Sequence, residues 1–136
     1  MQLKDLFATT ADPGSLFKLW VIEGVIVPER PGRGPGMHAE YDGANVIAMR
    51  LALKMHDAGV KVRRYSKAFG ELHEWLRRTS KSEWPAYRVT MTLDQAFIVH
   101  RNIDQNLTAD GYFVDMRRLV NPSKSLSSTR NIAQRL

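Results

Sequence analysis

The chain has 136 residues, 43% of them hydrophobic, which suits one compact domain or a small domain with an appendage. Twenty basic against fourteen acidic residues give a net charge of +6, which favours a polyanionic partner. The sequence has no apolar run near the roughly 20 residues that span a bilayer, no secretory leader pattern and no cysteine, so membrane insertion, secretion and thiolate chemistry are not expected. We therefore expect a cytoplasmic protein.

Two short helices are predicted at the start of the chain. Apolar residues at positions i, i+3 and i+4 predict an amphipathic helix over residues 3–9. A second helix is predicted over residues 13–23, because Asp12 can cap it, Pro13 suits its first turn and its apolar residues recur at helical spacing. Gly24 is expected to end this helix, since glycine adopts the left-handed conformation without a Cβ clash.

A short strand and a basic loop are predicted next. The β-branched residues 25–27 indicate the strand, and residues 29–38 form a loop rich in glycine and proline. The loop lacks the Gly-Lys-Ser/Thr of a phosphate-binding loop, and the segment before it is too small to fold alone, which argues against an interdomain linker. We therefore expect a hairpin. Its cationic candidates for contacting a partner are Arg30, Arg33 and His38.

Two longer helices are predicted in the middle of the chain. Asp42 is expected to cap a helix that runs to about Ala58 and ends at Gly59. Apolar residues cover most of its circumference, so this helix should be central to the core. Apolar residues at intervals of three and four predict a further helix over residues 62–76. The early part of its outer face carries Arg63, Arg64 and Lys67.

Residues 80–122 are predicted to form a small β-rich region. Period-two alternation indicates a strand at 87–92, and short apolar runs indicate strands at 96–100 and 112–114. These strands fit an antiparallel sheet that packs on the preceding helix or on a second subunit. The remaining residues form a serine-rich tail that we expect to be flexible. The predicted division of the chain is thus 1–79, 80–122 and 123–136.

The segment from residue 3 to residue 76 resembles the DNA-binding domain of MerR-type transcription regulators. The resemblance covers somewhat over half of the chain and rests on the order and spacing of several short motifs. These are Lys18 where the family usually has arginine, the aromatic Trp20, the Gly24-Val25-Ile26-Val27-Pro28 run, Tyr41 after the wing, and the Ala58-Gly59-Val60 turn. The chain departs from the pattern at Gly36-Met37-His38, where the family has glycine-tyrosine-arginine, and at Val21, where it has an acidic residue.

The resemblance implies an α+β, mostly α fold: a MerR-like winged helix-turn-helix over residues 1–79 with a small antiparallel β appendage on the C-terminal side. The implied function is sequence-specific transcription regulation on double-stranded DNA in the cytoplasm, in association with the nucleoid. Helix 13–23 would enter the major groove and the wing at 29–38 would lie on the flanking backbone. The implied DNA-binding residues are Ser15, Lys18, Arg30, Arg33, His38, Arg63, Arg64 and Lys67.

A homodimer is expected, because one winged domain has limited affinity and two-fold dimers read two half-sites. The sequence shows no long C-terminal coiled-coil helix of the kind usual in the family. Dimerisation is therefore expected to use Trp75, Leu76 and Trp84 together with the strand region. A further protein partner could bind through the C-terminal half.

No catalytic, cofactor or metal site is expected. The four histidines have no metal-ligand spacing among themselves or with the carboxylates, and His73 is expected to be a surface residue or a satisfied core residue. Nucleophile elbows and dinucleotide fingerprints are absent from the sequence, so we do not expect an enzyme.

Two alternatives remain open at the level of sequence. The same fold could serve as an excisionase-like architectural factor or a DNA-binding antitoxin. It could also be a protein-interaction adaptor that does not bind DNA, since residues 1–80 are only weakly basic and the wing arginine is missing.

Overall fold

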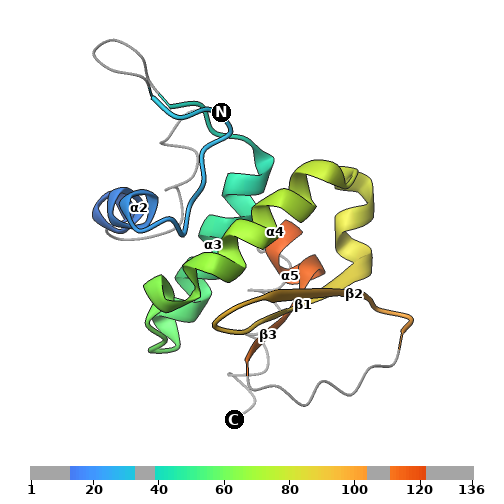
Figure 1. Cartoon of the computed structure of the whole chain (residues 1–136). Coiled ribbons are helices and arrows are strands. Elements are labelled where there is room, and N and C mark those ends of the chain that lie inside the picture. Colours follow the sequence, from blue (N-terminus) through green and yellow to red (C-terminus); the bar gives the residue numbers. More distant parts are fainter. Residues whose placement is uncertain (1–12, 33–38, 104–110, 122–136) are drawn as a thin grey trace.

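The computed structural model describes residues 13–32, 39–103 and 111–121. Its elements are α2 (Pro13–Ile22), α3 (Gly43–Asp57), the 3₁₀ turn η1 (Val62–Tyr65), α4 (Ser66–Arg78), the 3₁₀ turn η2 (Lys81–Ala86), β1 (Tyr87–Met91), β2 (Ala96–His100), β3 (Tyr112–Asp115) and α5 (Met116–Val120). Helices α3 and α4 lie side by side at the centre, with α2 on one flank and the sheet on the other (Figure 1). The helix predicted at 3–9 and the tail at 123–136 lie outside the described residues.

Two glycines end α2 and α3 in the way that the sequence predicts. Gly24 and Gly59 have φ angles of +79° and +82°, in the left-handed region. After α2, the N–H of Val25 donates to the Trp20 carbonyl at 2.9 Å; after α3, the N–H of Val60 donates to the Met55 carbonyl at 2.9 Å. Both ends are therefore Schellman motifs, which satisfy carbonyls that the helix leaves unpaired.

The strand predicted at residues 25–27 is absent. Val25 and Ile26 are buried, and both of their N–H groups donate to the Trp20 carbonyl in the cap of α2, so they are not free to form a ladder. These β-branched residues pack in the core at the end of α2. Because their N–H groups are already bound in the helix cap, the strand prediction is wrong.

Helix α3 is the central element of the core, as predicted. The Asp42 carboxylate accepts from the Asn45 N–H at 3.2 Å, and the Asn45 side chain accepts from the Asp42 N–H at 2.9 Å, which completes a capping box. Met49 and Met55 are fully buried and act as packing residues. The helix predicted over 62–76 begins one turn later than expected, because residues 62–65 form a 3₁₀ turn with an i→i+3 bond from the Arg64 N–H to the Lys61 carbonyl.

The predicted small antiparallel sheet is confirmed, with strand order β2-β1-β3. Val89 in the central strand lies opposite Ile98 in β2 and Val114 in β3. The sheet packs on α4 of the same chain, where a Glu71 carboxylate oxygen accepts from the Ala96 N–H at 3.1 Å. One hydrophobic cluster extends from α2 to α5, so the predicted boundary after residue 79 does not separate two cores.

Candidate nucleic-acid interface

The main-chain groups of Val27, where the chain leaves α2 and enters the basic loop, are bound by side chains of α3 and α4. The Val27 N–H donates to His73 Nε2 at 3.3 Å, and the Val27 carbonyl accepts from Asn45 Nδ2 at 2.7 Å. Arg77 also donates to this carbonyl through a guanidinium nitrogen. These side chains take the place of a neighbouring strand, because they satisfy both polar groups of a residue that no ladder pairs. We call Val27, Asp42, Asn45, His73 and Arg77 the wing-base network.

His73 is neutral in this network, and its tautomer follows from its partners. Nδ1 lies 2.7 Å from the Phe69 carbonyl, which can only accept, so Nδ1 carries the proton and Nε2 accepts from Val27 and Asn45. The pKa of His73 is lowered from its ordinary value of 6.5 to about 4, chiefly by burial, and the charge of Arg77 acts in the same direction. The hydrogen bond to the Phe69 carbonyl and the carboxylate of Asp42 act in the opposite direction without restoring the ordinary pKa.

An ion pair closes the network on its outer side. Arg77 Nε lies 3.0 Å from a carboxylate oxygen of Asp42, and the two side chains are 28% and 23% exposed. Burial alone would raise the pKa of Asp42, but the hydrogen bond and charge of Arg77, together with the hydrogen bond from the Asn45 N–H, hold the pKa below its ordinary value. The same carboxylate caps α3, so the base of the loop, the start of α3 and the end of α4 are joined by one set of hydrogen bonds.

The two ends of the basic loop are paired. Arg30 and Glu40 form an antiparallel bridge in which the Arg30 N–H donates at 3.3 Å and the Glu40 N–H donates at 2.8 Å. Tyr41, which follows the bridge, packs edge-to-face on Phe17 of α2 with ring centroids 5.0 Å apart. This pairing is what a hairpin requires at its base. Arg33 and His38, predicted near the tip, lie outside the described residues.

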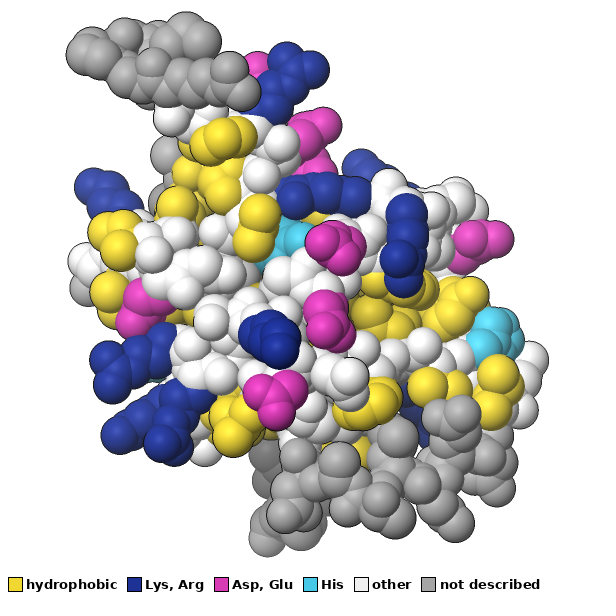
Figure 2. All heavy atoms as spheres, viewed as in Figure 1, with side chains coloured by type: hydrophobic (Ala, Val, Ile, Leu, Met, Phe, Trp, Pro, Cys, Tyr) yellow, Lys and Arg dark blue, Asp and Glu magenta, His cyan; other side chains and the backbone are white. Residues whose placement is uncertain are grey.

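The predicted DNA-binding residues that the structure describes are exposed. They are Ser15 and Lys18 on α2, Arg30 at the loop, Arg63 and Arg64 in η1, and Lys67 at the start of α4. Figure 2 shows Lys and Arg side chains both at the loop and on the flank below α2, with Asp and Glu side chains between them. The cations therefore occupy separate positions. Because acidic side chains lie between them, they do not form a continuous basic stripe on this face.

The exposed side of α2 is also partly apolar. Leu19 is 47% exposed and Ile22 is 83% exposed, whereas Phe17 and Trp20 are each 3% exposed. The sequence pattern placed Leu19 with the buried residues, because a helical repeat cannot show how wide the contact stripe will be. The buried stripe of α2 is therefore narrower than its apolar face.

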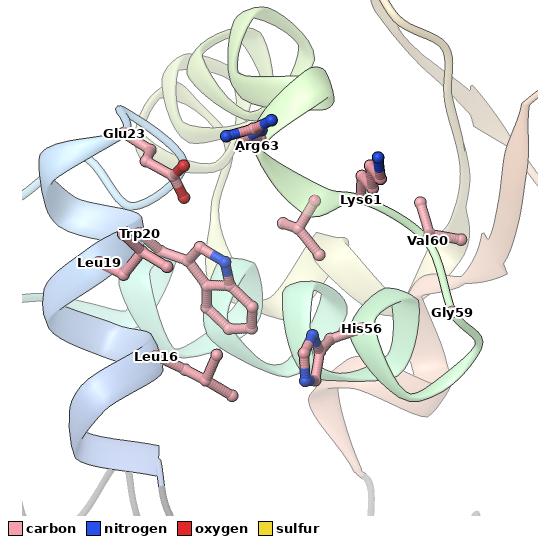
Figure 3. Close-up of a pocket in the computed structure, with 10 residues that line it drawn as sticks. Leu16, Leu19, Trp20, Glu23, His56, Gly59, Val60, Lys61 and Arg63 are labelled. Atoms are coloured by element: carbon pink, nitrogen blue, oxygen red, sulfur yellow. The ribbon is translucent and has the colours of Figure 1, made fainter.

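A groove of about 440 Å³ runs along α2 on the side of the α3–η1 turn (Figure 3). Its apolar lining comes from both sides: Leu16 and Trp20 from α2, and Val60 and Val62 from the turn and η1, with Trp20 and Val62 only 3% and 4% exposed. The Trp20 ring packs edge-to-face on His56 with centroids 5.9 Å apart. Glu23, Lys61 and Arg63 form its charged rim.

The predicted dimerisation residues are committed to the core of the chain itself. Leu76 is 1% exposed and Trp84 is 5% exposed, and the indole N–H of Trp84 donates to the carbonyls of Leu76 and Thr79 at 3.2 and 3.1 Å. Trp75 is half-buried and packs edge-to-face on Tyr87 at 4.8 Å. Leu76 and Trp84 offer no surface to a second subunit, so their assignment to a dimer interface is corrected.

Sequence reasoning missed the residues that hold the wing base: Asn45, His73 and Arg77. Two signals pointed to them. Asp42 and Asn45 have the spacing of a capping box, and His73 lies four residues after Phe69 within the apolar repeat of α4. Neither signal identifies Val27 as the partner, since Asn45 and His73 are 18 and 46 residues away from it.

Comparison with protein-family models, curated proteins and solved structures finds no match to this chain. Among the described residues, every helix is too short or too polar to cross a membrane. The interpretation of the site therefore rests on its own geometry.

Proposed function

We propose that the protein is a sequence-specific DNA-binding transcription regulator that places α2 in the major groove and the basic loop on the flanking backbone. The observation that carries this proposal is the rigid link between the two candidate contact elements. The wing-base network fixes Val27, which lies between exposed Lys18 on α2 and exposed Arg30 on the loop. Two contact elements held in one relative position suit a rigid duplex.

The charges on these elements are available to phosphates. Arg30 meets Glu40 only at 3.7 Å, and both side chains are largely exposed, so the pair contributes little and can exchange for a phosphate contact. No ion pair with another described residue engages Lys18. Such contacts would position the protein, and in the proposed function exposed Ser15 reads base edges from the same face of α2.

In the proposed function the protein acts as a homodimer on two half-sites, since these few contacts give one copy limited affinity. The fold is proposed to be a winged helix-turn-helix, with residues 30–40 as its wing and Arg63, Arg64 and Lys67 beside the DNA backbone. Binding would be in the cytoplasm, at the nucleoid.

The test is a fluorescence titration of genomic DNA fragments, including the region upstream of the protein's own coding sequence, at about 50 and 200 mM salt with competitor DNA. We expect one fragment to stay bound at the higher salt. Lys18→Met and Arg30→Met should each lower the slope of log affinity against log salt by about one, while Arg118→Met on α5 should leave it unchanged. Equal binding to all fragments, lost with salt, would instead indicate charge alone.

A second candidate, a protein-interaction adaptor, is favoured by one specific observation. Leu19 and Ile22 expose apolar side chains on the helix that would otherwise face DNA. If no fragment binds at either salt, the adaptor function replaces the first proposal.

A further inference from the structure

The outer edge of the sheet along β2 has main-chain groups that point away from the ladder. At the two ends of the β1–β2 ladder, the Arg101 N–H donates to the Ala86 carbonyl at 2.8 Å and the Thr92 N–H donates to the Gln95 carbonyl at 2.9 Å. Hydrogen-bonded and non-hydrogen-bonded pairs alternate along an antiparallel ladder. In this register, the residues of β2 that direct their N–H and carbonyl groups away from β1 are Ala96, Ile98 and His100.

Some of these outward groups already have partners. A Glu71 carboxylate oxygen of α4 accepts from the Ala96 N–H at 3.1 Å, and the His100 carbonyl accepts from the Ile103 N–H at 3.0 Å. Both main-chain groups of Ile98, the His100 N–H and the Ala96 carbonyl have no partner among the residues that the structure describes. Unpaired main-chain groups at a sheet edge are a template for a further strand.

This pattern of free and bound groups is self-complementary. If β2 of a second copy lies antiparallel with Ile98 opposite Ile98, each Ile98 N–H can donate to the other Ile98 carbonyl, and each His100 N–H to the other copy's Ala96 carbonyl. The groups left over at each end, the Ala96 N–H and the His100 carbonyl, are those that each copy already binds internally. An unrelated peptide strand would instead bring a free carbonyl to the Ala96 N–H that Glu71 already holds.

The side chains of β2 fit the same register. Phe97 of one copy lies opposite Val99 of the other, on the face of the sheet away from Ile98. Pairs of an aromatic and a β-branched residue are among those that stabilise neighbouring strands. Because the axis is two-fold, the dimer contains this pair twice.

The surface of α4 beside β2 carries charges of both signs. Glu74, Trp75 and Arg78 of α4 border a cleft of about 370 Å³, with Ile98 on its β2 side. Glu74 and Arg78 are exposed, and no ion pair with another described residue engages either of them. A two-fold axis normal to the sheet keeps both α4 helices on one face and makes them antiparallel, so Glu74 of one copy would face Arg78 of the other. Mixed charge in this arrangement suits a second copy of the chain.

The opposite edge of the sheet is protected. Strand β3 has four residues, ends at the charged Asp115 and leads directly into α5. Short strands and charged residues are common ways of protecting an edge, whereas the segment Ala96–His100 contains no lysine, arginine, proline or acidic residue. Pairing through β2 alone therefore closes after two copies.

We propose that β2 pairs with β2 of a second copy about a two-fold axis at Ile98. This interface deepens the homodimer of the proposed DNA-binding function and rests on that function for its role. The sheet and α2 lie on opposite flanks of the α3–α4 pair (Figure 1), so the interface leaves the proposed DNA contacts free. Because two strands of five residues bury little area, we expect a weak dimer that forms at micromolar concentrations.

The first test uses the direction of the Ile98 N–H. Proline is tolerated on an edge strand where the N–H points outward, so Ile98→Pro keeps the β1–β2 ladder but removes the central intermolecular donor. Ile98→Val is the matched control, because it keeps the N–H and the β-branched shape. Sedimentation of the full chain without DNA should show a monomer–dimer equilibrium that Ile98→Pro weakens by about tenfold or more and that Ile98→Val leaves unchanged.

A charge swap on α4 tests the interface without altering the strand. Glu74→Arg should weaken the dimer about fivefold, because it places like charges opposite each other twice in a two-fold dimer. The double variant Glu74→Arg, Arg78→Glu should restore the native affinity.

A protein that stays monomeric, or a dimer that neither Ile98→Pro nor Glu74→Arg weakens, would overturn the proposal. The result is separable from the DNA-binding proposal. A dimer with these responses in a protein that binds no genomic fragment would support the interface and remove the DNA-binding function. A monomer that still binds one fragment specifically would do the reverse.

Discussion

Helix α2 and the loop that follows it are stabilised differently on their two sides. On one side, the wing-base network satisfies both main-chain groups of Val27 with buried or half-buried side chains of α3 and α4. On the other side, α2 leaves Leu19 47% exposed and Ile22 83% exposed.

This difference between the two sides shows which residues need specific hydrogen bonds and which do not. A main-chain residue without a ladder needs hydrogen bonds, since an unpaired buried N–H or carbonyl costs about 1–3 kcal/mol. Partly exposed apolar side chains cost far less, so a groove can stay open without unfolding the domain. The polar side fixes the position of the loop, and the apolar side leaves Leu19 and Ile22 in contact with water.

The largest expected effect is a loss of stability in acid that originates on the polar side. Unfolded His73 titrates near 6.5 and folded His73 at about 4, so between these pH values the unfolded state binds more protons. The stabilisation is complete above pH 6.5 and falls as the pH drops to about 4, by at most about 3 kcal/mol. Urea unfolding between pH 7 and pH 4 measures it.

Asp42 acts in a lower window. Its folded pKa lies below 3.8, so its contribution is lost only as the pH falls through that lowered pKa. A stability that stays constant from pH 7 to pH 4 would contradict the assignment of His73 as a buried neutral residue.

The next effect is that of replacing the imidazole. His73→Leu keeps an apolar side chain of similar size but leaves the Val27 N–H without its acceptor, so we expect a loss of about 2 kcal/mol in the free energy of unfolding at pH 7. The difference between the variant and the native protein should shrink as the pH falls towards 4. His56→Leu is the matched control, because His56 is exposed at the groove. Equal effects of the two variants would remove the contrast between the two sides.

A smaller loss is expected from the outer ion pair. Arg77→Met removes the 3.0 Å contact with Asp42 and one donor to the Val27 carbonyl, which Asn45 still satisfies. We expect a loss of about 1 kcal/mol, since the pair is partly exposed to solvent. Chemical denaturation of this variant beside Arg78→Met, which changes an exposed neighbour on α4, measures the difference. If both variants lose the same amount, the ion pair contributes nothing specific.

The smallest effect belongs to the apolar side. Leu19→Gln and Ile22→Gln should each change the free energy of unfolding by less than about 0.5 kcal/mol, because Leu19 is about half exposed and Ile22 largely exposed. Thermal unfolding of dilute protein is the measurement. A loss above about 1 kcal/mol would mean that a second copy or another part of the chain covers these residues.

The sequence alone determined the elements whose cause is local. Pro13 at the start of α2, Asp42 as the cap of α3, and Gly24 and Gly59 as left-handed helix ends are all set by backbone and capping chemistry within a few residues. The three strands followed from local patterns in the same way: alternation for β1 and short apolar runs for β2 and β3.

Only the tertiary structure decided which residues meet. The sequence led to Leu76 and Trp84 being assigned to a dimer interface, because it does not show which chain covers an apolar side chain. The η2 turn instead folds Trp84 back onto the end of α4 of the same chain. The run at residues 25–27 has strand composition, yet the cap of α2 and the side chains of Asn45 and His73 take its hydrogen bonds. Long-range pairing of this kind depends on the packing of α3 against α4, which no local window of sequence contains.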